Sequence, residues 1–220
     1  RLYRCWKRVR DSMFQLSGLV GKDLNGKTCG IVGTGKIGRI TAKIFKSMGM
    51  QVICYDVHKS DIVTGELGLQ YVELDEIYAR ADVISIHVPL LPSTYHLINA
   101  EAITKMKEGV LIINVSRGAL VDTAALVEGI AWGKIGGAGL DVYEKEQDIF
   151  FKNFSQMDDE SQLLSMNHEF MHLRSLPNVV ITPHSAFLTH EALANICDTT
   201  IQNAQEFAAG KPLTNRVQKP

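Results

Sequence analysis

The chain has 220 residues, of which 45% are hydrophobic and 21% charged, and its formal net charge is −1. That balance is typical of a globular protein long enough to bury a core, and it gives no bulk field that favours nucleic acid or a membrane surface as partner. No apolar run approaches the roughly 18 residues of a membrane span, and no signal peptide is visible.

The chain opens on a basic amphipathic segment, Leu2–Phe14, which predicts a helix. Its basic side chains alternate with apolar ones such as Trp6 and Val9. We interpret it as a surface or interface helix, and a contact with a polyanion is the alternative. The first residue is Arg1 rather than Met, so we expect either a processed protein or a fragment. A loop is expected over Ser17–Gly26.

The segment Thr28–Gly38 reads TCGIVGTGKIG. Its apolar run, Cys29–Val32, leads into three glycines, and a helix is predicted over Arg39–Met48. A second apolar run, Gln51–Tyr55, ends in Asp56. Strand, glycine turn, helix, strand and acid form a dinucleotide-binding βαβ unit, although a lone glycine motif can be purely structural.

The glycines of this loop, the start of the following helix and Asp56 each have an expected role in binding a dinucleotide. Gly33 permits the tight turn, Gly35 lets the backbone approach a pyrophosphate, and Gly38 lets the helix pack close to the strand. Free N–H groups around Lys36 and Ile37 would hold the phosphate oxygens. Asp56 would accept hydrogen bonds from the adenosine ribose and repel a 2′-phosphate, which favours NAD over NADP. A solvated acid at a strand end is the alternative interpretation of Asp56.

Apolar runs and amphipathic segments alternate along the rest of the chain. The apolar runs are continuous, as in strands buried on both faces, so the fold class is α/β, a doubly wound parallel sheet of Rossmann type. Between them, His58–Gly68 is irregular, and Tyr143–Ser175 is mostly polar with a short helix expected near Asp159–Ser165. Strands are expected at Gln70–Leu74, Asp82–Val88, Gly109–Val115, Gly137–Val142 and Asn178–Thr182, and helices at Asp75–Arg80, Asn99–Met106, Asp122–Trp132 and Thr189–Ala209. Asp122 is a plausible N-cap, and Gly210 a stop for the last helix.

Chemistry is expected beyond the carboxyl ends of these strands, because ligands of open parallel sheets bind there. Arg117 follows one strand, and its planar guanidinium can donate two parallel hydrogen bonds to a carboxylate. His184 follows the last strand and is a natural proton donor to a ketone near neutral pH. A nearby carboxylate would favour its charged form. The candidates for that role are Glu146 and Asp141; Glu144 lies on the same edge.

The four cysteines are far apart in the sequence, and no pair has metal-ligand spacing. We therefore expect no metal site and treat Cys5, Cys29, Cys54 and Cys197 as reduced thiols of a cytoplasmic protein.

Five motifs in order resemble a known family: VGTGKIG at 32–38, HVPL at 87–90, NVSRG at 114–118, GLDVYEKE at 139–146 and TPHSAF at 182–187. The chain resembles the D-isomer-specific 2-hydroxyacid dehydrogenases over nearly all its length. The stretch after Glu146, the polar insert and the residues after His184 are most similar to the D-lactate dehydrogenase branch.

The resemblance implies roles for particular residues. Arg117 would clamp the substrate carboxylate and polarise its keto group. Glu146 would pair with His184, which would give its proton to the carbonyl oxygen as hydride arrives from NADH. Asp141 would orient the nicotinamide end. On the cofactor, Val88, Pro89 and Thr94 would line the adenosine side, and Val115 and Ser116 would reach toward the nicotinamide half. His87 and His96 are candidates for the border of the cleft.

The resemblance also implies an organisation. Residues 1–186 would be the NAD-binding domain, with an interface helix at its start, and residues 187–220 would belong to a substrate domain whose larger part precedes Arg1 in family members. We therefore expect a fragment. A homodimer is expected, for which the apolar side of the first helix is suited. The implied reaction interconverts pyruvate and D-lactate; the alternatives are another 2-keto acid, an NAD-sensing corepressor-like binding protein, or an inactive cofactor-binding domain.

Overall fold

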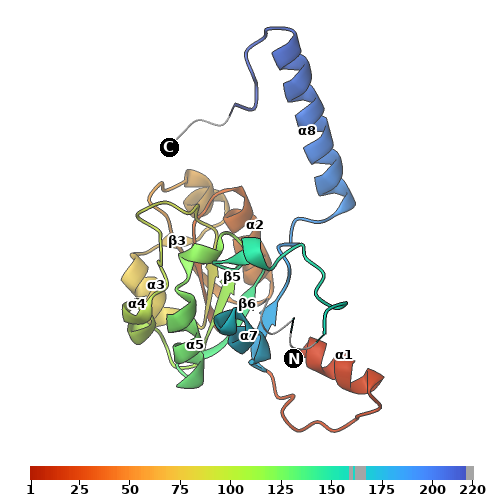
Figure 1. Cartoon of the computed structure of the whole chain (residues 1–220). Coiled ribbons are helices and arrows are strands. Elements are labelled where there is room, and N and C mark those ends of the chain that lie inside the picture. The colour runs from red at the N-terminus through yellow and green to blue at the C-terminus, as the bar shows by residue number, and fades with distance from the viewer. Residues whose placement is uncertain (159–160, 162–166, 217–220) are drawn as a thin grey trace.

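The computed structural model describes residues 1–158, 161 and 167–216. Its centre is a seven-stranded sheet in the order β3-β2-β1-β4-β5-β6-β7, in which every neighbouring pair is parallel (Figure 1). The strand order reverses between β1 and β4, so the sheet is doubly wound and the expected fold class is confirmed. The strands are β1 Thr28–Val32, β2 Gln51–Tyr55, β3 Gln70–Tyr71, β4 Val83–Ile86, β5 Val110–Asn114, β6 Ile135–Leu140 and β7 Val179–Ile181.

Helices connect the strands, as the alternating pattern predicted. They are α1 Leu2–Arg10, α2 Lys36–Ser47, α3 Leu74–Arg80, α4 Ala100–Lys105, α5 Thr123–Ala131, α7 His168–Ser175 and α8 His190–Ala208, with single turns η1 Ile62–Glu66, η2 Gly118–Leu120 and η3 Glu146–Asp148. Asp122 caps α5 as expected, because its side chain accepts a hydrogen bond from the backbone N–H of Ala125.

Two expected boundaries were wrong, and one helix was not expected. The first helix ends at Arg10 instead of Phe14, because Ser12 turns into the left-handed region at φ 57° and Arg8 bonds to the carbonyls of the following loop. The expected strand at Gln70–Leu74 stops at Tyr71, since Leu74 already begins α3. Helix α7 was not expected, and the helix expected near Asp159–Ser165 falls almost entirely outside the described residues.

The two faces of the sheet carry separate apolar cores. On β1, Val32 belongs to the core shared with α3, α4 and α5, whereas Cys29 and Ile31 belong to the core shared with α2. Alternate residues of a strand point to opposite faces, which explains why this continuous run is buried throughout. The layer of α3, α4 and α5 on one side of the sheet is visible in Figure 1.

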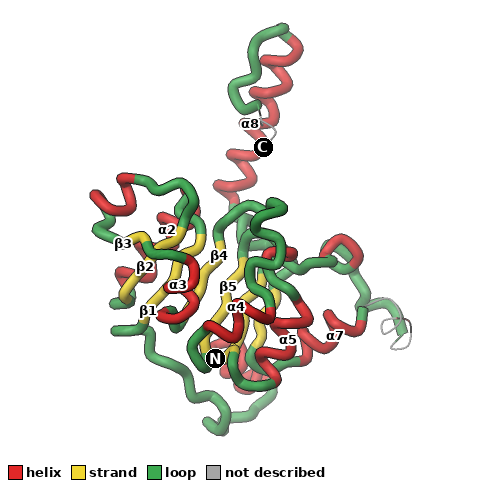
Figure 2. Tube along the Cα trace, turned by 90° about the vertical axis from the view of Figure 1, so that its left-hand side faces the viewer, coloured by secondary structure: helices red, strands yellow, loops and turns green. Residues whose placement is uncertain are grey.

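Helix α8 differs from the others because none of its residues is buried. It begins after the N-cap Thr189 and is followed by Gly210 at φ 64°, as expected for its start and stop. Both views show it standing away from the sheet and its covering helices (Figures 1 and 2).

Candidate active site

The glycine loop between β1 and α2 has two positions that only glycine fits. Gly33 has φ 97°, and a Cβ there would lie 2.7 Å from the backbone carbon of His87. A Cβ at Gly38 would lie 1.9 Å from the carbonyl oxygen of Gly33. The tight turn and the close helix packing expected from the sequence are therefore both present.

Gly35, the remaining glycine of the loop, faces open space: a Cβ there would have no protein atom within 4 Å. It is also the N-cap of α2, and no side chain caps this helix. Helix N-termini with unsatisfied N–H groups attract phosphate. The loop thus fits a pyrophosphate over Lys36 and Ile37, with Gly35 leaving room for its approach.

Asp56 follows β2 and is held firmly in the carboxylate form. One of its oxygens accepts hydrogen bonds from the backbone N–H and the hydroxyl of Thr34, at 2.6 and 3.0 Å, and the other accepts from the N–H of His58 at 2.9 Å. Burial raises its pKa, but the bonds from Thr34 and His58 outweigh burial and leave the pKa below its usual range. A fixed anion at this strand end suits a pair of ribose hydroxyls.

The loops after β4 and β5 are joined to each other. Thr94 donates to the carbonyl oxygen of Pro89 at 2.7 Å, which closes the first loop on itself. The hydroxyl of Ser116 donates to the carbonyl oxygen of Val88 at 2.6 Å and so ties the second loop to the first. Val115 is 37% exposed beside them. The structure therefore gathers these expected cofactor contacts beyond neighbouring strands.

Glu146 and His184 lie in contact. Nδ1 of His184 is 3.0 Å from Oε1 of Glu146, and the second carboxylate oxygen accepts from the backbone N–H of Tyr143 at 3.0 Å. An ionised carboxylate only accepts hydrogen bonds, so Nδ1 carries the proton and Nε2 is left for a ligand. His184 has φ 52°, a region that non-glycine residues rarely adopt and that is often found at functional sites.

Asp141 is buried and serves the same loop. Its carboxylate accepts from the hydroxyl of Thr182 and from the backbone N–H groups of Ser185 and Ala186, at 3.0 and 2.9 Å for the two amides. Its own carbonyl accepts from the N–H of His184 at 2.8 Å. Asp141 thus fixes the turn that carries His184, and its expected contact with a nicotinamide stays a prediction.

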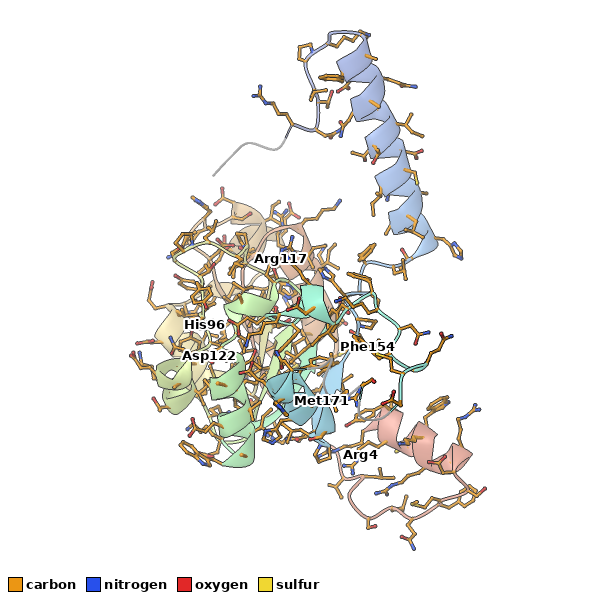
Figure 3. The ribbon with its side chains drawn as sticks, in the orientation of Figure 1. Arg4, His96, Arg117, Asp122, Phe154 and Met171 are labelled. Carbon is orange, nitrogen blue, oxygen red and sulfur yellow. The ribbon has the colours of Figure 1, made fainter. Side chains whose placement is uncertain are left out.

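Arg117 lies on the loop after β5 with its side chain exposed, and its Nη1 donates to the carbonyl oxygen of Ser116 at 2.7 Å. The next residue, Gly118, packs so closely that a Cβ there would lie 2.1 Å from the backbone carbon of Tyr143. In Figure 3, Arg117 is seen near the edge of the sheet from which α8 departs. The Arg117 loop therefore abuts the turn that carries Glu146, while the guanidinium is turned to its own loop.

Sequence reasoning missed the residues that hold these groups in place. Thr34 lies between two of the loop glycines and anchors Asp56; Tyr71, from β3, contacts the Thr34 hydroxyl at 2.7 Å. Thr182 anchors Asp141. Thr34 and Thr182 each lie inside a motif singled out in the sequence, the glycine loop and TPHSAF, whereas Tyr71 lies in none of the five motifs. His87, expected at the border of the cleft, has a pKa lowered to about 4 by burial, so its imidazole is neutral at pH 7.

Among the described residues, no group of three or more histidine, cysteine or acidic side chains is arranged to hold a metal ion. Nor is any helix in the described part of the chain long and apolar enough to cross a bilayer.

The order of the strands in the sheet and the glycine loop after β1 together define a Rossmann-type dinucleotide-binding domain. Residues 1–186 match the model of the D-isomer specific 2-hydroxyacid dehydrogenase NAD binding domain. The chain belongs to this family, so the resemblance expected from the five motifs and the cofactor assignment to NAD are confirmed.

Individual relatives agree with the family. The chain is 46% identical to a 2-hydroxyacid dehydrogenase homolog of Haemophilus influenzae, covering 99% of this chain and 63% of the relative, and 43% identical to D-lactate dehydrogenase of Escherichia coli, covering 99% and 64%. Among solved structures, the pyruvate reductase of Chlamydomonas reinhardtii has a TM-score of 0.93 at 47% identity, covering 97% of this chain and 63% of that one. D-lactate dehydrogenase of Lactobacillus jensenii, crystallised with NAD+, has a TM-score of 0.84 at 33% identity, covering 99% and 64%. The chain thus spans somewhat less than two thirds of these relatives.

Proposed function

We propose that this chain is the NAD-binding part of an oxidoreductase that interconverts pyruvate and D-lactate. The observation that carries the proposal is the Glu146–His184 pair, at 3.0 Å, on the same strand edge as the glycine loop. Relatives named D-lactate dehydrogenase and a neighbour named pyruvate reductase support this choice of substrate.

The residues of the loop would hold the cofactor. The N–H groups of Lys36 and Ile37 would bind the pyrophosphate, and Asp56 the adenosine ribose. Bound NADH would supply a hydride to the carbonyl carbon of the keto acid. The remaining assigned contacts would be Val88, Pro89 and Thr94 on the adenosine side, and Val115, Ser116 and Asp141 toward the nicotinamide.

His184 would move the proton. Its Nε2 would donate to the carbonyl oxygen during reduction and accept the proton back from the hydroxyl during oxidation. Glu146, bonded to Nδ1, would stabilise the charged imidazolium and fix the ring orientation. Arg117 would turn from the Ser116 carbonyl to the substrate carboxylate, which its fork of donors can bind in two places.

We infer two units along the chain: residues 1–186 as the NAD-binding domain, and 187–220 as a segment of the substrate domain. The lack of any buried residue in α8 supports this division, because a helix with Leu193, Ile196 and Ile201 about half exposed lacks a partner for its apolar side.

A homodimer is the second part of this organisation. Helix α2 and its C-cap residue present an outward apolar stripe at helical spacing, whose residues are between 48 and 60% exposed: Ile37, Ile40, Ile44 and the C-cap Met48. Such a stripe suits a second copy of the chain, as does the apolar side of α1. Light scattering would show a dimer, and Ile44→Lys should weaken it; a monomeric wild-type chain at micromolar concentration would contradict this assignment. The expected cytoplasmic location stays a prediction.

The test of function has two arms. NADH titration of the 220-residue chain measures cofactor binding. Turnover is measured in a chimera that places the substrate-domain segment of the Escherichia coli D-lactate dehydrogenase before Arg1. NADH oxidation with pyruvate, and little with bulky keto acids, supports the proposal. Comparable rates on an aromatic keto acid would favour the alternative suggested by the aromatic 2-oxoacid reductase of Clostridium sporogenes, 44% identical to this chain. Binding without any turnover would favour an NAD-sensing protein.

A further inference from the structure

Glu144 lies on the turn after β6, and its carboxylate contacts residues from two other loops. Its Oε1 is 2.8 Å from Nε2 of His96, on the loop after β4. Its Oε2 accepts a hydrogen bond from the hydroxyl of Thr123, at the start of α5, at 3.2 Å. The side chain of Glu144 is 19% exposed. A single carboxylate therefore joins the loops that follow β4, β5 and β6.

His96 is itself held in a defined position. Its ring stacks on Tyr95 with centroids 3.9 Å apart, and its backbone N–H donates to the carbonyl oxygen of Ala119 at 2.9 Å. Its Nδ1 lies 3.7 Å from Oδ2 of Asp122, and Figure 3 shows the two residues side by side. The ring thus lies between Asp122 and Glu144, and the backbone of His96 has φ 48°. Because the His96 ring is held by these contacts, its Nε2 has a defined position opposite the carboxylate of Glu144.

The backbone next to Glu144 supports the acid–base pair. Its neighbour Tyr143 donates its N–H to Glu146 at 3.0 Å, and Glu146 contacts His184 through its other oxygen. Gly118, which follows Arg117, packs on the same backbone: a Cβ there would lie 2.4 Å from the N of Glu144. Any shift of the turn at residues 143–144 would therefore be transmitted to both Glu146 and the Arg117 loop.

We propose that Glu144 is a positioning residue for the acid–base site, acting through its bonds to His96 and Thr123. This inference rests on the proposed function for its kinetic readout. The carboxylate does not meet the substrate; it fixes the Tyr143 N–H that holds Glu146. Small displacements of a catalytic group lower the rate strongly, about a hundredfold for 1 Å.

The variants separate positioning from general stability. Glu144→Ala removes the contacts with His96 and Thr123 and a longer hydrogen bond from the Tyr95 hydroxyl at 3.4 Å, and we expect kcat in the chimera to fall at least tenfold while the NADH dissociation constant changes less than twofold. Glu144→Gln keeps an oxygen that can accept from Nε2–H of His96 and places an amide donor against the Thr123 hydroxyl, which can accept, so it should restore kcat to within threefold of wild type. Glu108→Ala is the matched control. Glu108 precedes β5, at the end of the sheet opposite the site; its side chain is 78% exposed and pairs with Lys134.

A second pair tests the route through His96. His96→Asn removes the ring but retains a side chain that tolerates positive φ. If Glu144 acts through His96, the double variant His96→Asn with Glu144→Ala should be no slower than Glu144→Ala alone. Additive losses would overturn the assigned route.

An NMR measurement tests this inference independently of the proposed function, because it does not require turnover. In the 220-residue chain, the imidazole N–H proton that bonds to Glu146 should give an NMR signal absent from His184→Ala. We expect Glu144→Ala to shift or broaden that signal and Glu144→Gln to retain it. An unchanged signal and unchanged kcat in Glu144→Ala would overturn the positioning role. If wild type turns over no keto acid, the proposed function fails, and the NMR signal alone decides whether Glu144 positions the pair.

Discussion

The two halves of the ligand-binding edge hold their groups by different means. In the nucleotide half, Gly33 and Gly38 are fixed by close backbone approach, and Asp56 is bonded to Thr34, 22 positions away. In the acid–base half, the side chain of Glu146 bonds to His184 across 38 positions, and that of Glu144 to His96 across 48. The first half is built mainly by close approaches of backbone to backbone, and the second by a polar network between loops. Substitutions in the nucleotide half should therefore affect the stability of the fold and cofactor binding. Substitutions in the acid–base half should lower the reaction rate.

The largest effect is expected at His184. His184→Ala removes the group assigned to proton transfer, which typically contributes about 10² to 10⁴ in rate. We expect kcat for pyruvate reduction by the chimera to fall by about 10³ while NADH affinity stays within twofold, because the side chain acts on the proton and not on the nucleotide. His190→Ala, at the exposed start of α8, is the matched histidine control. A His184→Ala variant with near-normal turnover would refute the assigned role.

The next effect concerns the fold of the nucleotide half. Gly38→Ala places a Cβ 1.9 Å from the carbonyl oxygen of Gly33, so α2 must move away from β1. Overpacking of this kind costs about 3 kcal/mol. Urea denaturation should show this loss relative to wild type, whereas Gly21→Ala, whose Cβ meets no atom within 4 Å, should be nearly neutral. Equal stabilities of the two variants would contradict the close approach at Gly38.

Gly35→Ala tests cofactor binding without the clash. Its Cβ meets no protein atom within 4 Å, so stability should hardly change. The methyl group would nevertheless occupy the space assigned to the pyrophosphate. We expect NADH affinity to fall about tenfold, which corresponds to about 1.4 kcal/mol. Fluorescence titration of both chains with NADH measures the difference, and unchanged affinity would show that the phosphates bind elsewhere.

The smallest effect is a pH dependence at Asp56. Its pKa in the folded state is lowered, because the bonds from Thr34 and His58 outweigh the effect of burial. Its charge therefore stabilises the folded chain above the ordinary carboxyl pKa of about 4, and this contribution is lost as pH falls through the folded value. Asp56→Asn should be less stable than wild type at pH 7, and the difference should shrink as pH falls below about 4 and through the lowered pKa of Asp56. A stability difference independent of pH would contradict the role of the charge.

The same contrast explains what could be predicted from sequence. The strands, the glycine loop, the N-cap Asp122 and the end of α8 at Gly210 follow from local patterns, and the structure confirms them. The sequence placed Asp141 on the correct edge, but its bonds to Thr182, Ser185 and Ala186 depend on how two distant loops meet. Helix α7 was missed because its apolar positions, such as Phe170 and Leu173, lie within a mostly polar segment.

We propose that both halves of the edge form one site for NADH. The most direct measurement is a crystal structure of the chain with NADH bound. We expect the pyrophosphate at the N–H groups of Lys36 and Ile37, the adenosine ribose at Asp56, and the nicotinamide ring beside the Glu146–His184 pair. A nucleotide bound with its nicotinamide directed away from His184, or bound outside the glycine loop, would contradict this proposal.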